Sequence, residues 1–405
     1  MSNPSALINA TCPACGLLCD DVVVSVTPPL NGQMASTSTC SKSIAFFSQA
    51  PLDTSPRILG KSVTLAQAVA RIVTILKESK QPLLAGLSTD LAGFRAAYRL
   101  AEKTNANLAH MNATTTWRNL KVLQSTGWQT TTLTEVKNRA DVIVCIGTDV
   151  VQHNPRFFER VVWTKEAMFV DPQVRDIIYL GGEGLDTSYG VSPSGKQPTI
   201  LSCAPALLPE LTAALHALVN GKVLKSNQVA GIPVADLASV AERLKQAKYA
   251  VLVWIAKDMD FPHAELAIQQ ITQTVVTLNE TTRAGGLALG GSDGDTTVNY
   301  AHTWLNGLAI QQETLPAHDA LIWVNSFSPD KPLPITAKPL IVLGHPAVKF
   351  EVEPEVFIPI ATPGLDCEGT LFRVDSSVVL PLKQVRESNA PTLVQVLVQI
   401  EDLLA

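Results

Sequence analysis

Two uninterrupted apolar runs constrain the fold of this 405-residue chain more than any other feature of its sequence. Residues 141–147 read DVIVCIG, and residues 249–255 read YAVLVWI. A strand with one wet face alternates apolar and polar residues, whereas a strand buried on both faces of a parallel sheet is apolar throughout. The two runs therefore predict central strands of an α/β fold, in which helices cover both faces of parallel sheets.

Helical and strand-like patterns alternate along the rest of the chain, as that fold requires. Thr64 is expected to cap a helix whose apolar residues recur at helical spacing as far as Leu76. Further helices are predicted at 91–103, 116–125, 155–163, 206–220, 233–247 and 262–272. Further strands are predicted at 22–26, 82–86, 167–170, 274–278, 320–325, 339–344 and 356–360, with Gly-rich loops at 181–198 and 285–294.

The chain divides into four predicted parts. Residues 1–56 form a small Cys-rich N-terminal segment, which ends in a linker, APLDTSP, with two prolines. Residues 57–140 are predicted to form a first α/β domain that residues 310–355 complete. Residues 141–309 are predicted to form a second, Rossmann-like α/β domain, and residues 356–405 a C-terminal segment.

Composition narrows the class of protein. Hydrophobic residues make up 46% of the chain and charged residues 17%, so we expect a large core rather than long disorder. The net charge of −5 argues against a broadly basic nucleic-acid surface. No stretch reaches the ~18 consecutive apolar residues of a membrane span, and the N-terminus lacks the pattern of a secretory signal. We therefore expect a cytoplasmic protein with no nucleic-acid partner and no membrane span.

Four of the seven cysteines fall within the first 40 residues, at Cys12, Cys15, Cys19 and Cys40. Their spacing, C-x2-C-x3-C-x20-C, in a chain without a secretory signal indicates a metal site rather than a disulfide framework. Four thiolates are the usual ligands of a [4Fe–4S] cluster. They also suit structural zinc, although a zinc ribbon usually has two C-x2-C pairs and this block has one. An empty, vestigial site is the third interpretation, and the sequence leaves all three open.

Outside this block the sequence shows few patterns that carry chemistry. His153 follows the first apolar run, at a strand end where doubly wound sheets bind ligands. The histidines show no H-x-x-H or H-x-H spacing, and no G-x-S-x-G or P-loop motif is present. Asp293 and Asp295, in a Gly-rich stretch, are expected to be solvated loop charges.

Five stretches together point to a known family. They are CPACGLLCDD followed by Cys40-Ser-Lys, LTEVKNRADVIV at 133–144, GTDVVQHNPR at 147–156, Val170-Asp-Pro, and VFIPIATPGLDCEGT at 356–370. In combination they resemble the B subunit of formylmethanofuran dehydrogenase, of the molybdopterin oxidoreductase superfamily. The resemblance implies a molybdopterin-oxidoreductase-like fold and a [4Fe–4S] cluster on the four N-terminal cysteines.

The chain departs from that family at the redox centre. The resemblance implies a tungsten or molybdenum ion held by two pterins and by a cysteine or selenocysteine, at a position that falls near Thr115 here. A hard hydroxyl is a poor substitute for a soft thiolate on such a metal, which argues against the pterin-bound metal. The expected remnants of the pterin pocket are Gly147, Asp149, His153, Gly290 and Gly291, with a plain flexible loop as the alternative for the last two.

These departures are similar to those of the formyltransferase/hydrolase complex of methylotrophic bacteria. That resemblance implies a B subunit that has lost its own catalytic activity and assembles with subunits A, C and D. The complex transfers a formyl group from formyl-tetrahydromethanopterin to a methanofuran-type carrier and releases formate. The alternatives are a redox-active B subunit of formylmethanofuran dehydrogenase with its cluster and pterin-bound metal, and a binding module with structural zinc.

Overall fold

The computed structural model describes residues 6–26, 34–50, 52–310, 315–334, 336 and 338–404. Parts of the predicted segments lie outside these residues, including Pro51 of the predicted linker and residues 1–5 of the Cys-rich segment. Contacts divide the chain into two compact units. Unit 1 comprises Met1–Thr114, Gly291–Arg373 and Val378–Ala405, and unit 2 comprises Thr115–Gly290 and Val374–Ser377.

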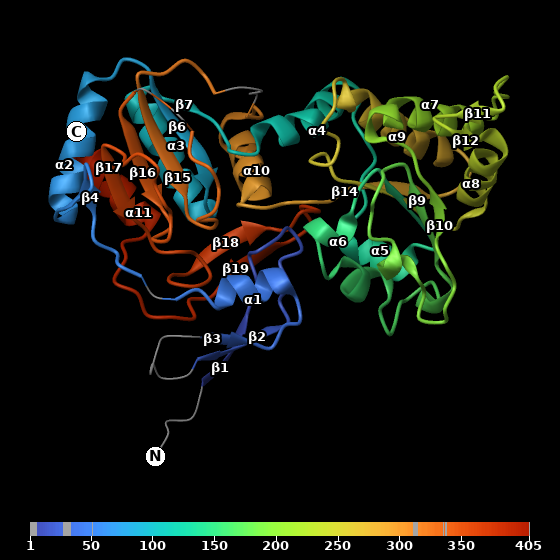
Figure 1. The fold of residues 1–405 in the computed structure, drawn as a ribbon, viewed down its shortest axis with the longest axis horizontal. Helices are drawn as coiled ribbons and strands as arrows, with labels where there is room; N and C mark the ends of the chain where they lie inside the picture. Colours follow the sequence, from blue (N-terminus) through green and yellow to red (C-terminus); the bar gives the residue numbers. More distant parts are fainter. Residues whose placement is uncertain are drawn as a thin grey trace. The chain divides into compact units, whose positions relative to one another are not determined.

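Unit 1 is built on a seven-stranded sheet, drawn in Figure 1. The five strands from β17 to β7 run parallel, and the short β4 and β5 add an antiparallel edge. The strands, in their order across the sheet, are β5 (Lys61–Ser62), β4 (Arg57–Ile58), β17 (Val356–Pro359), β16 (Leu340–Gly344), β15 (Ala320–Asn325), β6 (Pro82–Ser88) and β7 (Asn107–Leu108).

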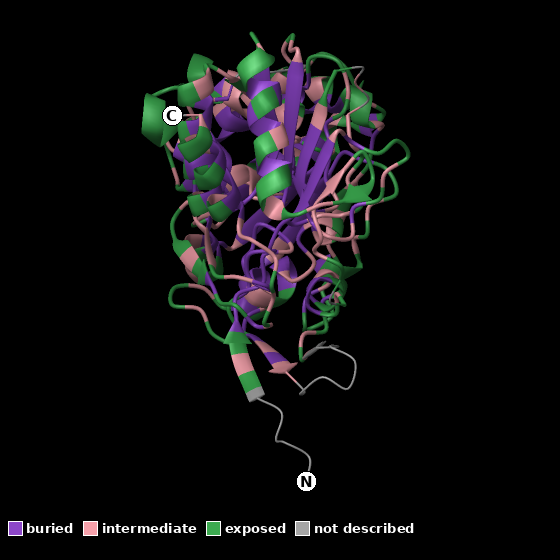
Figure 2. Ribbon diagram, turned by 90° about the vertical axis from the view of Figure 1, so that its left-hand side faces the viewer, coloured by how far each residue is buried: buried purple, intermediate pink, exposed green. Residues whose placement is uncertain are grey.

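Four helices cover one face of this sheet: α2 (Leu65–Glu78), α3 (Leu91–Thr104), α10 (Asp295–Asn306) and α11 (Leu393–Leu403). The predicted cap of α2 is confirmed, because Thr64 and Gln67 form a reciprocal capping box. Figure 2 shows the strands buried and the outer sides of the helices exposed. On the opposite face, strand residues such as Trp323 pack against Met111 and Phe350, which lie outside helices and strands.

Smaller elements complete unit 1. The N-terminal strands β1 (Ala6–Ala10), β2 (Val22–Val26) and β3 (Met34–Ser36) form an antiparallel sheet, and helix α1 (Ser41–Phe47) follows it. Strands β18 (Gly369–Phe372) and β19 (Val379–Leu382) pair as a second antiparallel ribbon. The loop between β1 and β2 carries Cys12, Cys15 and Cys19, so these short strands position the cysteine block.

Unit 2 is built on a five-stranded, fully parallel sheet. The core on one face is formed by three helices, α7 (Leu208–Val219), α8 (Val234–Gln246) and α9 (Ala264–Leu278). Figure 1 shows α5 (Leu133–Arg139) and α6 (Val150–His153) on the other side. The strands, in their order across the sheet, are β10 (Thr199–Leu201), β9 (Asp176–Leu180), β8 (Val142–Ile146), β13 (Ala250–Trp254) and β14 (Ala284–Ala288).

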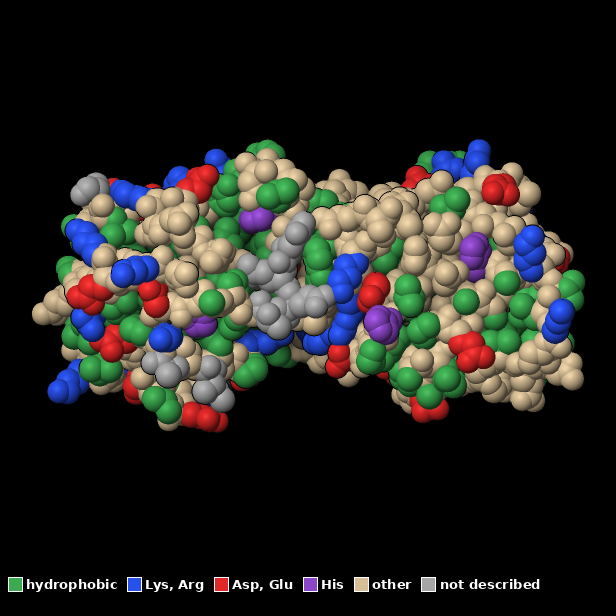
Figure 3. All heavy atoms as spheres, turned by 90° about the horizontal axis from the view of Figure 1, so that it is seen from above, with side chains coloured by type: hydrophobic (Ala, Val, Ile, Leu, Met, Phe, Trp, Pro, Cys, Tyr) green, Lys and Arg blue, Asp and Glu red, His purple; other side chains and the backbone are tan. Residues whose placement is uncertain are grey.

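The predicted α/β fold with parallel sheets is confirmed by both units. The remaining elements are helix α4 (Ala113–Ser125), the two-residue strands β11 (Gln228–Val229) and β12 (Ile232–Pro233), a π-helical turn at Phe158–Val162 and three 3₁₀ turns. In the part of the chain that is described, no helix combines the length and the apolar character needed to cross a membrane. Figure 3 shows basic and acidic side chains interspersed over one face of the molecule.

Three predicted elements are wrong. The strand expected at 274–278 is the last part of α9, where Ile271, Val275 and Leu278 are buried at helical spacing. The strand expected at 167–170 is an irregular segment, because its backbone N–H groups at Met168 and Phe169 bond to Asn138 instead of to a strand. The helix expected at 155–163 is replaced by the short α6 before it and the π-helical turn.

The loop expected at 285–294 contains strand β14, whose glycines make room for neighbouring side chains. A Cβ on Gly285 would lie 2.6 Å from the Cβ of Thr131, and one on Gly286 would lie 3.0 Å from the Trp254 ring. Glycine in a strand often marks such a close approach. The glycines that predicted a loop are therefore packing residues of a strand.

The units also differ from the predicted domain boundaries. Residues 115–140, with α5 and most of α4, belong to unit 2 rather than to the first domain, and residues 291–309, with α10, belong to unit 1. The predicted C-terminal segment is not separate, since β17 pairs with β16 and α11 packs against α2 and α3. Strands pair with partners that are distant in the chain. Boundaries drawn along the sequence therefore could not show which segments form each unit.

Candidate functional site

Each parallel sheet has one point at which the strand order reverses. In unit 1 the chain passes from β6 to β7 on one side and returns to β15 on the other side. In unit 2 it passes from β8 to β9 and β10, and returns to β13 on the other side of β8. Open parallel sheets bind ligands outside the carboxyl ends of the strands at such switch points. The two strand ends are therefore the candidate sites that the fold itself indicates.

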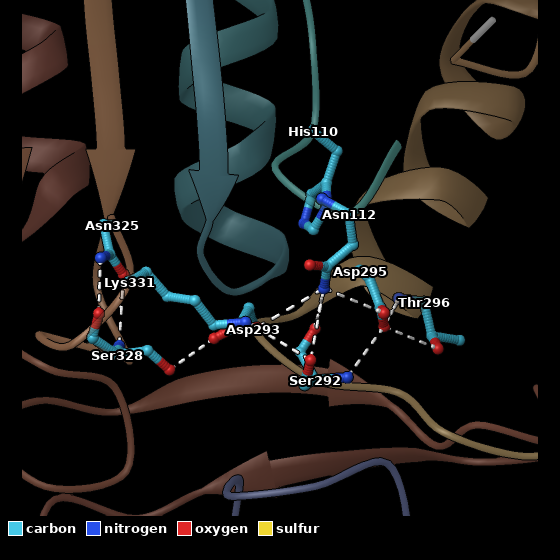
Figure 4. Close-up of polar contacts among 9 residues, drawn as sticks. All are labelled: His110, Asn112, Ser292, Asp293, Asp295, Thr296, Asn325, Ser328 and Lys331. Carbon is cyan, nitrogen blue, oxygen red and sulfur yellow. Dashed lines mark hydrogen bonds and ion pairs between the residues drawn. The ribbon is translucent and has the colours of Figure 1, made fainter. Parts of the chain in front are cut away.

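Asp293 is the centre of the polar cluster in unit 1 (Figure 4). Its side chain is 1% exposed, and it accepts hydrogen bonds from the hydroxyls of Ser328 at 2.5 Å and Ser292 at 2.8 Å. The Lys331 ammonium lies 3.0 Å from the same carboxylate. Burial raises the pKa of Asp293, but Lys331 and the hydroxyl donors outweigh it and hold the pKa below its usual range. Asp293 is therefore a buried, paired carboxylate.

Asp295 lies two residues further on, in the first turn of α10. It accepts hydrogen bonds from the backbone N–H groups of Thr296 at 2.6 Å and Ser292 at 3.2 Å. The Asn112 amide donates to Asp295 at 3.4 Å and to Asp293 at 3.5 Å. Protein atoms surround the carboxyl, and this burial, with the nearby charge of Asp293, raises the pKa of Asp295 to about 6.

His110 follows β7 and lies beside Asn112 in the same cluster. Its Nδ1 accepts a hydrogen bond from the backbone N–H of Asn112 at 3.0 Å. The main-chain carbonyl of Asp293 is near, but Nε2 forms no hydrogen bond within the described part of the chain. Burial lowers the pKa of His110 to about 4, so the ring is neutral at pH 7.

Buried hydroxyls gather at the carboxyl ends of the same sheet. Those of Ser88, Thr89, Ser326 and Thr362 have no hydrogen-bond partner among the described residues. Buried polar groups without a protein partner are usually satisfied by ordered water or by a ligand. No sequence pattern indicated this cluster, and the interpretation of Asp293 and Asp295 as solvated loop charges is wrong. The only signal was a Gly-rich stretch, which says nothing about burial.

The switch point of unit 2 holds a smaller polar group centred on Asp258, which follows β13. His153 Nε2 lies 2.6 Å from Asp258 Oδ1, and the Thr148 hydroxyl donates to Oδ2 at 2.6 Å. The backbone N–H of Asp149 also donates to Oδ2, at 3.2 Å, while the Asp149 side chain caps α6. The His153 and Asp258 side chains are 15% and 20% exposed, so this pair is more accessible than Asp293.

The three glycines predicted as pocket remnants have separate local roles. Gly147 ends β8 with φ +59°, and a Cβ there would overlap the Leu208 side chain of α7. Gly290, with φ +109°, exchanges two hydrogen bonds with the Asn154 amide at 2.9 and 3.0 Å. The carbonyl of Gly291 accepts a hydrogen bond from the N–H of Gly16 in the cysteine loop at 2.7 Å. Each position thus has a packing or backbone reason of its own.

All four N-terminal cysteines are buried. The loop that carries three of them is closed by a hydrogen bond from the Cys12 N–H to the Cys19 carbonyl at 2.9 Å. Cys12 interacts electrostatically with Cys15 and Cys19, and burial, the largest effect, raises its pKa to about 12. Ser43 is near the Cys12 thiol, and Cys40 stands at the N-cap position of the same helix, α1, one turn earlier. Four buried thiols on one loop and one adjoining helix suit the donor set of an iron–sulfur cluster.

No group of three or more His, Cys, Asp or Glu side chains within the described ranges is arranged to hold a single metal ion. A four-iron cluster is larger than one ion and separates its thiolates further. The assignment of Cys12, Cys15, Cys19 and Cys40 as metal ligands stays a prediction.

Thr115 lies half-buried in the first turn of α4. The sequence has no cysteine between Cys40 and Cys145, so no neighbour of Thr115 in α4 supplies a thiolate. Cys145 is fully buried inside β8. The residues present at this position do not fit a pterin-bound tungsten or molybdenum ion that needs a protein thiolate.

No profile of a known protein family matches the chain. Two curated relatives are named as the B subunit of tungsten-containing formylmethanofuran dehydrogenase 2; the protein from Methanococcus maripaludis is 25% identical and that from Methanocaldococcus jannaschii 26% identical. Each alignment covers 93% of both chains. A third relative, the Fhc B subunit of the formyltransferase/hydrolase complex from Methylorubrum extorquens, is 26% identical over 86% of this chain and 97% of that protein.

The chain resembles these B subunits over most of its length. A solved structure, the formyltransferase/hydrolase complex FhcABCD from Methylorubrum extorquens with methylofuran, contains a chain of the same fold. Its TM-score is 0.69 at 23% identity, and the match covers 86% of this chain and 98% of that one. The resemblance predicted from the sequence motifs is confirmed.

Proposed function

We propose that this chain is the B subunit of a formyltransferase/hydrolase complex and that it supplies scaffold rather than chemistry. One observation carries the proposal: the segment around Thr115, where the tungsten-dependent relatives are expected to supply a thiolate, contains none. A threonine hydroxyl is neutral at pH 7 and cannot replace a thiolate as a soft, charged ligand. The relative that is the Fhc B subunit supports the same assignment.

The proposed partners are subunits A, C and D, which together with this chain would transfer a formyl group to a methanofuran-type carrier and release formate. Within each unit the carboxylate at the switch point is paired, Asp293 with Ser328 and Lys331, and Asp258 with Thr148. The pterin-pocket remnants at Gly147, Asp149, His153, Gly290 and Gly291 stay a proposal, and so does the cytoplasmic location.

The test is to co-express the full chain with subunits A, C and D of the same genome and to purify the complex anaerobically. We expect formyl transfer and formate release, no viologen-dependent formyl oxidation, and far less than one tungsten or molybdenum ion per complex by mass spectrometry. Stoichiometric pterin-bound metal on this chain would overturn the proposal.

The four buried cysteines favour a second candidate, a redox subunit with a [4Fe–4S] cluster, because a cluster is most useful as an electron relay. Iron, sulfide and zinc analysis of the anaerobic complex separates a cluster from structural zinc and from an empty site. Cys15→Ser should abolish bound iron, and Cys203→Ser, a buried cysteine outside the block, is the matched control. Bound iron together with viologen reduction would favour this candidate over the scaffold.

A further inference from the structure

Helix α1 places a serine on its buried face. The buried residues of this helix are Ser43, Phe46 and Phe47, and the two phenylalanines follow the serine by three and four residues, so all three share one side. Ser43 is 2% exposed, and its hydroxyl has no hydrogen-bond partner among the described residues. A buried hydroxyl without a partner lowers the stability of a fold. Packing alone therefore does not explain a serine at this position.

The Ser43 hydroxyl lies beside the Cys12 thiol, near enough to act on it but outside the geometry of a hydrogen bond. A neutral thiol is a weak hydrogen-bond acceptor, whereas a thiolate carries a full charge and is a much stronger one. Cys12 becomes a thiolate when it binds a metal, because its sulfur then bonds to the metal and its proton is released to solvent. Occupancy of the cysteine block therefore creates, at Cys12, the acceptor that Ser43 lacks.

The cysteine loop itself supplies one donor to this sulfur. The backbone N–H of Ala14 is in hydrogen-bond contact with the Cys12 thiol. The N–H of Gly16 is engaged elsewhere, since it donates to the Gly291 carbonyl at 2.7 Å. Ser43 comes from α1 rather than from the loop, so its hydroxyl would add a second donor from a separate element.

We infer that the Ser43 hydroxyl donates a hydrogen bond to the Cys12 thiolate when the cysteine block holds a metal. The bond ties the loop that carries three of the cysteines to the helix that begins after Cys40. Hydrogen bonds to a ligand sulfur stabilise its charge and fix its orientation, so Ser43 is a positioning residue of the metal site. The inference applies to iron and to zinc alike. It goes beyond the proposed function, because it requires an occupied cysteine block and does not involve subunits A, C and D.

The test compares full-length Ser43→Ala with the wild-type chain after anaerobic purification. Iron, sulfide and zinc analysis first identifies the metal that the wild-type chain holds. A chelator then removes this metal, and its loss is followed by the visible absorbance of an iron–sulfur cluster or by a colorimetric zinc indicator. Ser43→Ala should lose the metal at least about tenfold faster, as expected when a residue that supports a ligand is removed. Ser41→Ala, at an exposed serine of the same helix, is the matched control and should change the rate less than about twofold.

Thermal melting of the metal-free chain separates this role from a structural one. Without a metal the Ser43 hydroxyl is buried and has no partner, so Ser43→Ala should leave the melting temperature unchanged or raise it. With the metal bound, the same substitution should lower the melting temperature, because it removes a hydrogen bond to a charged sulfur. A residue that only stabilised the fold would lower the melting temperature in both states.

The other outcomes count against the inference. Equal rates of metal loss from Ser43→Ala and wild type would overturn it, and so would a lower melting temperature of the metal-free variant. If the wild-type chain holds neither iron nor zinc, the inference is also wrong, while the proposed scaffold function is unaffected. If the wild-type chain holds a metal that Ser43 retains but does not assemble with subunits A, C and D, the proposed function fails and the inference stands.

Discussion

The switch points of the two units are equivalent in topology but differ in burial. Asp293 in unit 1 is 1% exposed and is paired with Lys331, whereas Asp258 in unit 2 is 20% exposed and is paired with His153. Both carboxylates lie at carboxyl ends of parallel strands. In unit 1 the polar side chains are enclosed with a second carboxylate and a neutral histidine, which gives the cluster strongly shifted pKa values.

This difference shows that fold position alone does not set the chemistry of a strand end. Burial makes each charge in unit 1 depend on its neighbours, because a charge that leaves water must be compensated by the protein. In unit 2 the charged side chains are partly exposed, and water compensates part of their charge. They therefore depend less on their protein neighbours. Unit 1 should therefore respond to substitution and to pH much more strongly than unit 2.

The largest expected effect follows removal of the charge that compensates Asp293. Lys331→Met should lower the free energy of unfolding by about 3 kcal/mol, because it leaves a buried carboxylate without its cation. Adding Asp293→Asn to this variant should recover much of the loss. Denaturant unfolding followed by tryptophan fluorescence measures both.

The control for Lys331 is Lys245→Met in unit 2. Lys245 pairs with Glu242 on the helix surface, where the side chains are 30% and 60% exposed, so the expected loss is below about 0.5 kcal/mol. Equal losses for the two lysine variants would contradict the contrast between the units.

The next effect concerns pH. The pKa of His110 is about 4 in the folded chain against an ordinary 6.5, so its contribution to stability is complete above pH 6.5 and is lost as the pH falls through 4. The pKa of Asp295 is about 6 against 3.8, so its contribution is complete below pH 3.8 and is lost as the pH rises through 6. Each contribution to the free energy of unfolding amounts to about 3 kcal/mol. Between pH 4 and 6 the two contributions change in opposite directions as the pH changes.

His110→Gln and Asp295→Asn should therefore tilt the stability profile in opposite directions. Relative to wild type, His110→Gln should gain stability as the pH falls from about 7 to 4, and Asp295→Asn should gain stability as the pH rises from about 4 to 7. Unfolding free energies measured across this range test the signs. If each variant differed from wild type by the same free energy of unfolding at every pH, neither group would titrate as described.

A smaller effect is expected at Gly147. Gly147→Ala should cost about 2 kcal/mol, because it combines a positive φ with an overlap on Leu208. Gly127→Ala, also at positive φ but with nothing within 4 Å, should cost about 1 kcal/mol from backbone strain alone. If the two substitutions cost the same, the packing explanation of Gly147 is wrong and a binding role gains support.

The smallest effect is expected at the more accessible pair of unit 2. His153→Gln should change the free energy of unfolding by less than about 1 kcal/mol, since the pair is partly hydrated and glutamine can still reach a hydrogen bond. A loss as large as that of Lys331→Met would mean that the two switch points are energetically alike.

Local patterns predicted the two central strands of unit 2 and the start of one helix correctly. The runs at 141–147 and 249–255 became β8 and β13, and the capping signal at Thr64 became the start of α2. Each of these signals depends on residues close together in the chain. The spacing of the cysteine block likewise indicated a metal site, and that assignment stays a prediction.

The same kind of signal failed where packing overrode it. Residues 274–278 are β-branched and apolar, yet they continue α9 because their buried positions match the core beside α7. Gly285 and Gly286 suggested a loop, yet they form β14 because Thr131 and Trp254 occupy the space above them. Both errors come from neighbours that are distant in sequence.

The sequence by itself determined the α/β class, the central strands and the family resemblance, because apolar runs, caps and motifs are properties of short segments. Only the tertiary structure decided that Asp293 is buried, since its partners Ser328 and Lys331 come from a segment 35 or more residues away. It also decided which segments complete each unit, and that Trp304 is exposed whereas Trp254 is in the core. Burial depends on what the rest of the chain places above a residue, and the residue's own neighbours in sequence do not encode it.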